Sequence, residues 1–199
     1  MDELTRPIEP RIEEQPLPRK HPFLTFIWEL IQIVVLAVVA YFGINFVTER
    51  IRVESISMEP TLHEGNFVMV NKLAYRWGEP EHGDVVVFKY PLDPDGTAPY
   101  IKRIVGLPGD VVVIENGLVI VNDQALEEPY IMEAPRYDGK WTVPEDSLFV
   151  LGDNRNRSSD SRIWGMVPYE NVIGKALFIY WPPENWRLFH SNEMHAAVP

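Results

Sequence analysis

Two residues of this chain carry side chains that together suit nucleophilic catalysis. Ser57 lies in the segment Ser55-Ile56-Ser57-Met58-Glu59-Pro60-Thr61-Leu62, and Lys102 lies in Tyr100-Ile101-Lys102-Arg103-Ile104-Val105. A serine hydroxyl is a poor nucleophile until a base removes its proton, and a lysine acts as that base only where an apolar site keeps its amine neutral. Lowering a lysine pKa from about 10.4 to about 8 needs roughly 3 kcal/mol of desolvation, which burial of one side chain can supply.

Each of these residues also has a non-catalytic interpretation. Ser57 fits a turn before Pro60, and Lys102 fits a surface lysine that keeps its amine in water. The alternation of a strand, however, places Lys102 on one face with Tyr100 and Ile104, where a charged amine is costly. A third polar segment, Gly152 to Arg162, follows a predicted strand and has the Asp, Asn, Ser and Arg content of a hydrogen-bonded loop.

The elements that must position these residues are mainly β-strands. We predict strands in seven apolar runs, at Phe67 to Val70, Asp84 to Phe88, Tyr100 to Val105, Val111 to Ile114, Leu118 to Val121, Ser147 to Leu151 and Val172 to Trp181. Asn116-Gly117 between two of them indicates a tight hairpin turn. Short strands separated by many prolines and glycines predict a mainly β, antiparallel sandwich or open barrel.

A membrane-length apolar run precedes this β region. Its more uniformly apolar part, Leu30 to Val47, has only Gln32 and Asn45 as strong polar interruptions. As a helix this part would be about 27 Å long, close to the thickness of about 30 Å of a bilayer hydrocarbon core. We therefore predict a disordered cytoplasmic tail at 1–22, a transmembrane helix at 23–48 and an extracytoplasmic domain at 49–199. A buried core helix and a cleavable signal peptide are the alternatives, but the polar tail, the length of the run and the Thr48-Glu49-Arg50 that follows it disfavour a signal peptide.

Charge and composition orient the chain and exclude several classes of site. Four basic residues precede the run and two follow it closely, which favours a cytoplasmic N-terminus; these are Arg6, Arg11, Arg19, Lys20, and then Arg50 and Arg52. A net charge of −11 without a long basic run disfavours nucleic-acid binding. The chain has no cysteine and its five histidines lack ligand spacing, so we predict no disulfide, no metal site and no cofactor.

Four motifs in this order resemble those of the type I signal peptidases. They are the serine segment, Gly83-Asp84-Val85-Val86-Val87-Phe88, the lysine segment with its continuation Gly106-Leu107-Pro108-Gly109-Asp110, and Gly152 to Arg162. The resemblance covers about residues 50 to 175. It implies a membrane-bound serine endopeptidase that removes signal peptides from exported pre-proteins, at the cytoplasmic membrane, close to the secretion translocon.

The resemblance also implies roles for individual residues. Ser57 matches the nucleophile, Lys102 the general base, Ser55 an oxyanion-hole donor and Ser158 the serine that orients the lysine. Asp160 and Arg162 match a structural ion pair. The small pockets that accept Ala-like residues would be walled by Met58, Leu62, Tyr100, Ile101 and Val53.

Spacing predicts that the second domain of some relatives is reduced here to a region around 111–151. Two other function classes remain alternatives. An SOS-repressor-like autoprotease also uses Ser and Lys, but it needs a DNA-binding module where this chain has an apolar span. A non-catalytic membrane-anchored β scaffold has no use for a desolvated lysine.

Overall fold

The computed structural model describes residues 22–93, 96, 98–190 and 195–196, so the predicted tail at 1–22, apart from Pro22, lies outside the described residues. The first element is a long helix, α1 (Pro22–Val47). Within the described part of the chain, its segment Thr25–Val47 is the one helix that is long and apolar enough to cross a membrane, and none of it is buried. The span predicted at 23–48 and the helix at Pro22–Val47 differ by one residue at each end, and Thr48 already belongs to the first strand.

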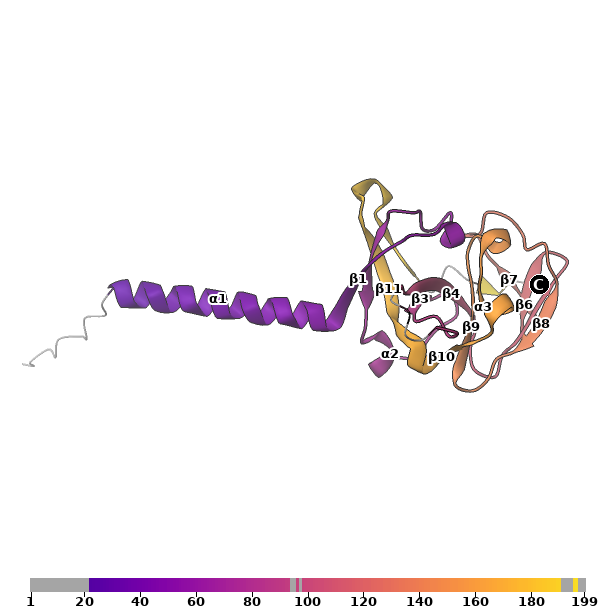
Figure 1. The fold of residues 1–199 in the computed structure, drawn as a ribbon, viewed down its shortest axis with the longest axis horizontal. Coiled ribbons are helices and arrows are strands. Elements are labelled where there is room, and N and C mark those ends of the chain that lie inside the picture. Colours follow the sequence, from indigo (N-terminus) through magenta and orange to yellow (C-terminus); the bar gives the residue numbers. More distant parts are fainter. Residues whose placement is uncertain (1–21, 94–95, 97, 191–194, 197–199) are drawn as a thin grey trace, which may run out of the picture. The chain divides into compact units, whose positions relative to one another are not determined.

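The larger of two sheets forms from strands that are far apart in the sequence (Figure 1). In the described residues it has eight strands in the order β1-β2-β11-β3-β4-β9-β10, with β12 paired to β11. Their bounds are β1 Thr48–Arg52, β2 Phe67–Asn71, β3 Val85–Phe88, β4 Tyr100–Gly106, β9 Ser147–Leu151, β10 Val167–Pro168, β11 Val172–Trp181 and β12 Arg187–Leu188. Each pair for which the register is defined is antiparallel.

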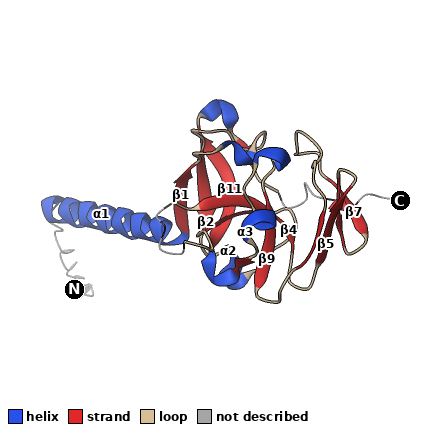
Figure 2. Ribbon diagram, turned by 45° about the vertical axis from the view of Figure 1, so that its right-hand side comes forward, coloured by secondary structure: helices blue, strands red, loops and turns tan. Residues whose placement is uncertain are grey.

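A smaller sheet lies beside the larger one, at the side away from β1 (Figure 2). It contains β5 (Val111–Glu115), β6 (Leu118–Val121), β7 (Gln124–Glu127), β8 (Gly139–Thr142) and β13 (His195–Ala196), in the order β13-β7-β6-β5-β8. The region predicted around 111–151 as a reduced second domain contains β5 to β8 of this sheet, and its last residues belong to β9, which pairs with β4 in the larger sheet.

Short helical segments complete the described fold. They are η1 (Ile56–Met58), α2 (Ala74–Trp77), η2 (Arg155–Arg157), α3 (Ser161–Trp164), η3 (Tyr169–Asn171) and η4 (Pro183–Asn185). Two of them matter for the site, because η1 carries Ser57 and η2 lies in the polar loop that begins at Gly152.

The mainly antiparallel β fold predicted from the sequence is confirmed. The Asn116-Gly117 turn joins β5 to β6, and both residues have positive φ angles, 53° and 79°. β4 lies between β3 and β9, so both of its edges are hydrogen-bonded and its side chains from Ile101 to Val105 are buried. This central position removes Lys102 from water.

Candidate active site

Ser57 is held by the loop that follows β9. It lies in η1, the element that follows β1, and is 7% exposed. Its backbone carbonyl accepts a hydrogen bond of 3.0 Å from the backbone N–H of Asn154, and the Asn154 side-chain amide donates to the Ile56 carbonyl at 3.1 Å. The turn that carries Ser57 is therefore held in place by its chain connection to β1 and by hydrogen bonds to the loop after β9, which lies about a hundred residues later in the sequence.

Lys102 points at Ser57 from the centre of the larger sheet. Its Nζ lies 2.6 Å from Ser57 Oγ and donates to the Ile101 carbonyl at 2.9 Å. The side chain is 3% exposed, and its cross-strand neighbour on β3 is the buried Val86. Burial lowers the pKa of Lys102 to about 8, although the negative charges of Asp160 and Asp153 oppose the shift by favouring the ammonium.

The two other serines named from the sequence occupy different positions relative to this pair. Ser55 Oγ lies 3.2 Å from Ser57 Oγ, on the exposed side of the turn. Ser158 is buried, and among the described residues its Oγ has no hydrogen-bond partner. The structure thus places Ser55 beside the hydroxyl of Ser57, whereas the expected hydrogen bond from Lys102 to Ser158 is not formed.

Gly152 is the residue that allows the loop to approach Ser57. A Cβ at this position would come closer than 3.0 Å to the Ser57 carbonyl oxygen and to the Ser158 side chain. Real Cβ atoms essentially never show such contacts, so any larger residue would push the two segments apart.

A buried ion pair, not anticipated from the sequence, ties the serine and lysine segments together. Arg103 donates to both carboxylate oxygens of Asp153, at 2.9 and 2.7 Å, and both side chains are fully buried. Thr61, four residues after Ser57, donates to the same carboxylate. Alternation along β4 does predict that Arg103 faces away from Lys102, but nothing local identifies its partner 50 residues later.

A second buried pair reaches from the smaller sheet region to the same loop. Arg155 makes two hydrogen bonds of 2.6 Å to Glu128, and its Nε donates to the Gly152 carbonyl at 3.2 Å. The ring of Tyr130 packs against the Arg103 guanidinium, with 3.9 Å from the guanidinium carbon to the ring centre.

The pair predicted at the end of the loop is formed. Arg162 donates to Asp160 at 2.6 and 2.9 Å, and also to the carbonyls of Arg155 and Ser158. Asp160 in turn accepts a hydrogen bond from the Gly152 N–H at 3.2 Å. The loop is therefore closed on itself around the position of Ser158.

A cleft of about 610 Å³ opens in front of the Ser57–Lys102 pair. Three of the five expected pocket residues, Val53, Tyr100 and Ile101, line it. Met58 and Leu62 do not; both are fully buried in the apolar core behind η1. No three histidine or acidic side chains gather into a metal site among the residues that the structure describes.

The geometry supports base-assisted attack by a hydroxyl. A neutral amine 2.6 Å from a serine oxygen is within the distance over which it can accept the hydroxyl proton, and the surrounding apolar groups favour the neutral form. No other side chain is in hydrogen-bonding contact with the Lys102 amine within the described part of the chain. This pair is therefore the candidate catalytic pair of the site.

A family model described as "Signal peptidase, peptidase S26" matches residues 27–181. Signal peptidase I of Leptolyngbya laminosa is 43% identical over 77% of this chain and 79% of its own length. Two proteins of Synechocystis sp., probable signal peptidase I-2 and probable signal peptidase I-1, are 44% and 38% identical; the matches cover 85% and 88% of this chain and 80% and 91% of theirs.

The match to the family model includes every segment that contributes to the site, from the serine turn to the loop after β9. The chain therefore belongs to the signal peptidase family S26, and it is a serine endopeptidase.

Proposed function

We propose that this peptidase removes N-terminal signal peptides from exported pre-proteins, with Ser57 as nucleophile and Lys102 as general base. The observation that carries the proposal is the distance of 2.6 Å between Ser57 Oγ and the Nζ of a lysine that is 3% exposed. The three relatives are named signal peptidase I, and their name indicates the substrate class.

The reaction follows from the roles of the two side chains. Lys102 Nζ accepts the hydroxyl proton while Ser57 Oγ attacks the scissile carbonyl carbon, and the resulting tetrahedral oxyanion collapses as the C–N bond breaks. The proton passes from Lys102 to the leaving amine, which leaves an ester between the signal peptide and Ser57. Lys102 then takes a proton from water as the water oxygen attacks the ester carbonyl carbon. The bond from that carbon to Ser57 Oγ breaks, Lys102 returns the proton to Ser57 Oγ, and the signal peptide leaves with a free carboxyl terminus.

The oxyanion needs hydrogen-bond donors beside Ser57. The Ser57 backbone N–H and the Ser55 hydroxyl suit this role, because Ser55 Oγ lies 3.2 Å from the attacking oxygen and its side chain is exposed toward the cleft. The Ser158 hydroxyl has no hydrogen-bond partner among the described residues, and we propose that it accepts a bond from the Lys102 amine during the reaction.

The substrate is expected to bind extended along β1 and the start of β4. Val53, Tyr100 and Ile101 line the cleft close to the pair, and we propose that they wall the pockets for small residues such as alanine. Tyr100 is braced by Tyr90, whose ring stacks on it at 4.8 Å, so this wall is rigid.

The helix α1 is proposed as a single-pass anchor in the cytoplasmic membrane, with the N-terminus in the cytoplasm and the catalytic domain outside. Its apolar segment Thr25–Val47 has the required length, and the basic residues before it favour this orientation. The anchor would hold the cleft close to pre-proteins that leave the translocon while their signal peptides still lie in the bilayer.

Two substitutions test the proposal directly. Ser57→Ala and Lys102→Met should each abolish cleavage of a pre-protein with an Ala-x-Ala site, with the domain still folded by circular dichroism. Lys140→Met, at an exposed lysine on β8, is the matched control and should leave cleavage unchanged. Cleavage retained by either dyad variant, or absent from the unmodified protein as for a scaffold, contradicts the proposal.

A further inference from the structure

The cleft that contains the dyad has a basic rim. Three arginines line it, Arg50, Arg52 and Arg157, and Glu54 is the one carboxylate among the described residues that do so. The chain as a whole carries a net charge of −11. The local charge of the cleft is thus opposite in sign to that of the protein.

Two of the arginines are presented by strand alternation. Arg50 and Arg52 lie two positions apart on β1 and are exposed, whereas Ile51 between them is buried in the core. Their cross-strand neighbours on β2 are Met69 and Phe67, not carboxylates. The two guanidinium groups therefore share one face, and their cross-strand neighbours supply no carboxylate.

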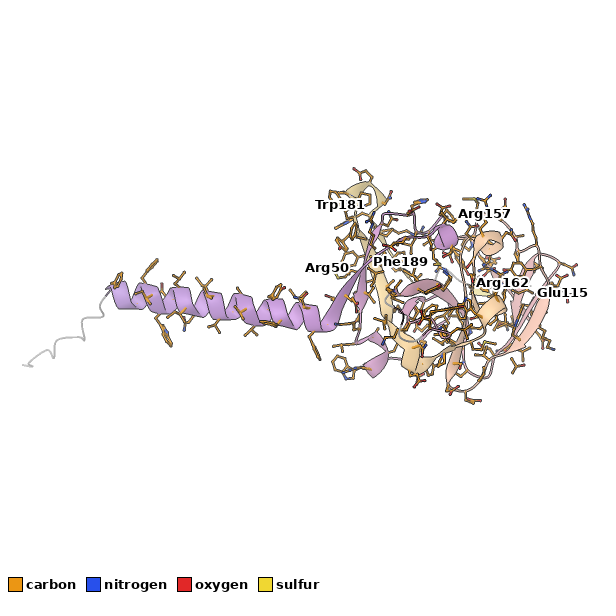
Figure 3. All side chains as sticks on the ribbon, viewed as in Figure 1. Arg50, Glu115, Arg157, Arg162, Trp181 and Phe189 are labelled. Atoms are coloured by element: carbon orange, nitrogen blue, oxygen red, sulfur yellow. The ribbon has the colours of Figure 1, made fainter. Side chains whose placement is uncertain are left out.

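The third arginine comes from the loop after β9. Arg157 ends η2, directly before Ser158, and its side chain is exposed. Figure 3 shows Arg50 beside β1 and Arg157 well apart from it. The pair Arg50 and Arg52 on β1 and the single Arg157 therefore form two basic groups in different parts of the cleft. None of the three arginines forms an ion pair or a side-chain hydrogen bond within the described part of the chain.

We propose that this rim is a binding site for acidic side chains of the substrate, on both sides of the scissile bond. This inference rests on the proposed function. Exposed guanidinium groups without partners pair with carboxylates at little desolvation cost, and a basic cleft on an acidic protein also attracts acidic segments from solution.

Chain continuity assigns the two groups to the two sides of the cut. β1 begins at the residue after α1 ends, so Arg50 and Arg52 lie within a few residues of the proposed anchor. They face the part of the substrate that still leads into the bilayer, which precedes the cut. Arg157 lies at the other part of the cleft and faces the residues that follow the cut.

Paired peptides test this site with the full-length protein in detergent micelles. Each pair has an Ala-x-Ala cleavage site and differs only by Asp or Asn at one position, placed either before the Ala-x-Ala sequence or after the cut. At low salt, kcat/KM for the Asp peptide should be about two- to fivefold higher than for the Asn peptide, which is the range expected for an exposed ion pair. The difference should come from KM, with kcat unchanged. At about 1 M NaCl, where the Debye length is about 3 Å, the difference should vanish.

Variants separate the two parts of the rim. Arg157→Gln should lose the preference for Asp over Asn at positions after the cut and keep it at positions before the cut. The double variant Arg50→Gln/Arg52→Gln should lose the preference before the cut and keep it after the cut. Arg76→Gln, an exposed arginine on α2 outside this cleft, is the control and should keep both preferences.

The outcomes distinguish this inference from the proposed function. If the unmodified protein cleaves Asp and Asn peptides equally at every position, or if the variants keep both preferences, the acidic-residue site is wrong while the peptidase function stands. If no peptide is cleaved, the proposed function fails and the inference fails with it.

Discussion

Gly152→Ala should inactivate the enzyme without unfolding it. The added Cβ would come closer than 3.0 Å to the Ser57 carbonyl oxygen, which is a backbone atom and cannot rotate away, and to the Ser158 side chain. The serine turn can relieve this contact only by moving away from the loop after β9. Because Lys102 belongs to β4 and stays in place, the Ser57–Lys102 distance of 2.6 Å must lengthen.

The size of the effect follows from the contact. Reaching ordinary van der Waals distance requires the Ser57 carbonyl to retreat by about 1 Å, and a misplacement of that size can cost about a hundredfold in rate. Overpacking of a well-packed site costs about 1–3 kcal/mol, less than the stability of a typical domain. We therefore expect kcat to fall about a hundredfold while the thermal unfolding transition stays cooperative and moves down by several degrees.

The assay measures kcat on a saturating Ala-x-Ala peptide together with Tm. Gly174→Ala on β11 is the matched control, because its Cβ would meet the Asn71 backbone closer than 3.0 Å but far from the serine turn. It should lower Tm by a similar amount and leave kcat per folded molecule nearly unchanged. A Gly152→Ala enzyme with near-normal kcat, or an equal loss of kcat in Gly174→Ala, would refute the reasoning.

Three further substitutions probe the groups around the dyad. Ser55→Ala should lower kcat by about a hundred- to a thousandfold with little change in KM, as measured by steady-state kinetics, because it removes an oxyanion donor. Glu128→Gln should lower the free energy of unfolding by about 3 kcal/mol or more, measured by urea denaturation, because Arg155 is left buried without its counter-charge. Asp153→Asn should move the acid limb of the rate profile to lower pH, because the Asp153 charge raises the Lys102 pKa; the same change removes the buried carboxylate that neutralises Arg103 and lowers Tm.

Controls and contrary results are specific to each of these. Glu127→Gln, at the exposed neighbour of Glu128, should leave stability unchanged. A rise in KM alone for Ser55→Ala would assign Ser55 to substrate binding and not to the oxyanion. An acid limb that moves to higher pH in Asp153→Asn would contradict the electrostatic argument for Lys102.

The sequence predicts those strands whose own residues are mostly apolar. Five predicted runs correspond to strands of the larger sheet, and no end differs by more than one residue. They are 67–70, 84–88, 100–105, 147–151 and 172–181. It does not predict β1, β7 or β8, whose residues are largely polar. These strands form because neighbouring strands supply the hydrogen bonds, as β2 does for β1 and β5 does for β8, and such pairing leaves no local pattern.

The site divides in the same way. Motif order singles out Ser57 and Lys102, and the structure brings them into contact. The sequence does not predict the buried network that aligns these segments, which consists of Arg103, Asp153 and Thr61. The local sequence around each charged residue is typical of a surface position, and the sheet topology determines which residue becomes its partner. The close approach at Gly152 is also a property of the assembled fold, and a glycine in a polar loop does not reveal it.

The pH dependence of kcat/KM tests the central claim, a neutral Lys102 that activates Ser57. The base must be unprotonated in the free enzyme, so activity should rise with pH and level off above the Lys102 pKa of about 8. With this pKa about one lysine in ten is neutral at pH 7, against about one in three thousand for an unshifted amine. An acid limb near 8 supports the account, and a limb near 10 would contradict it.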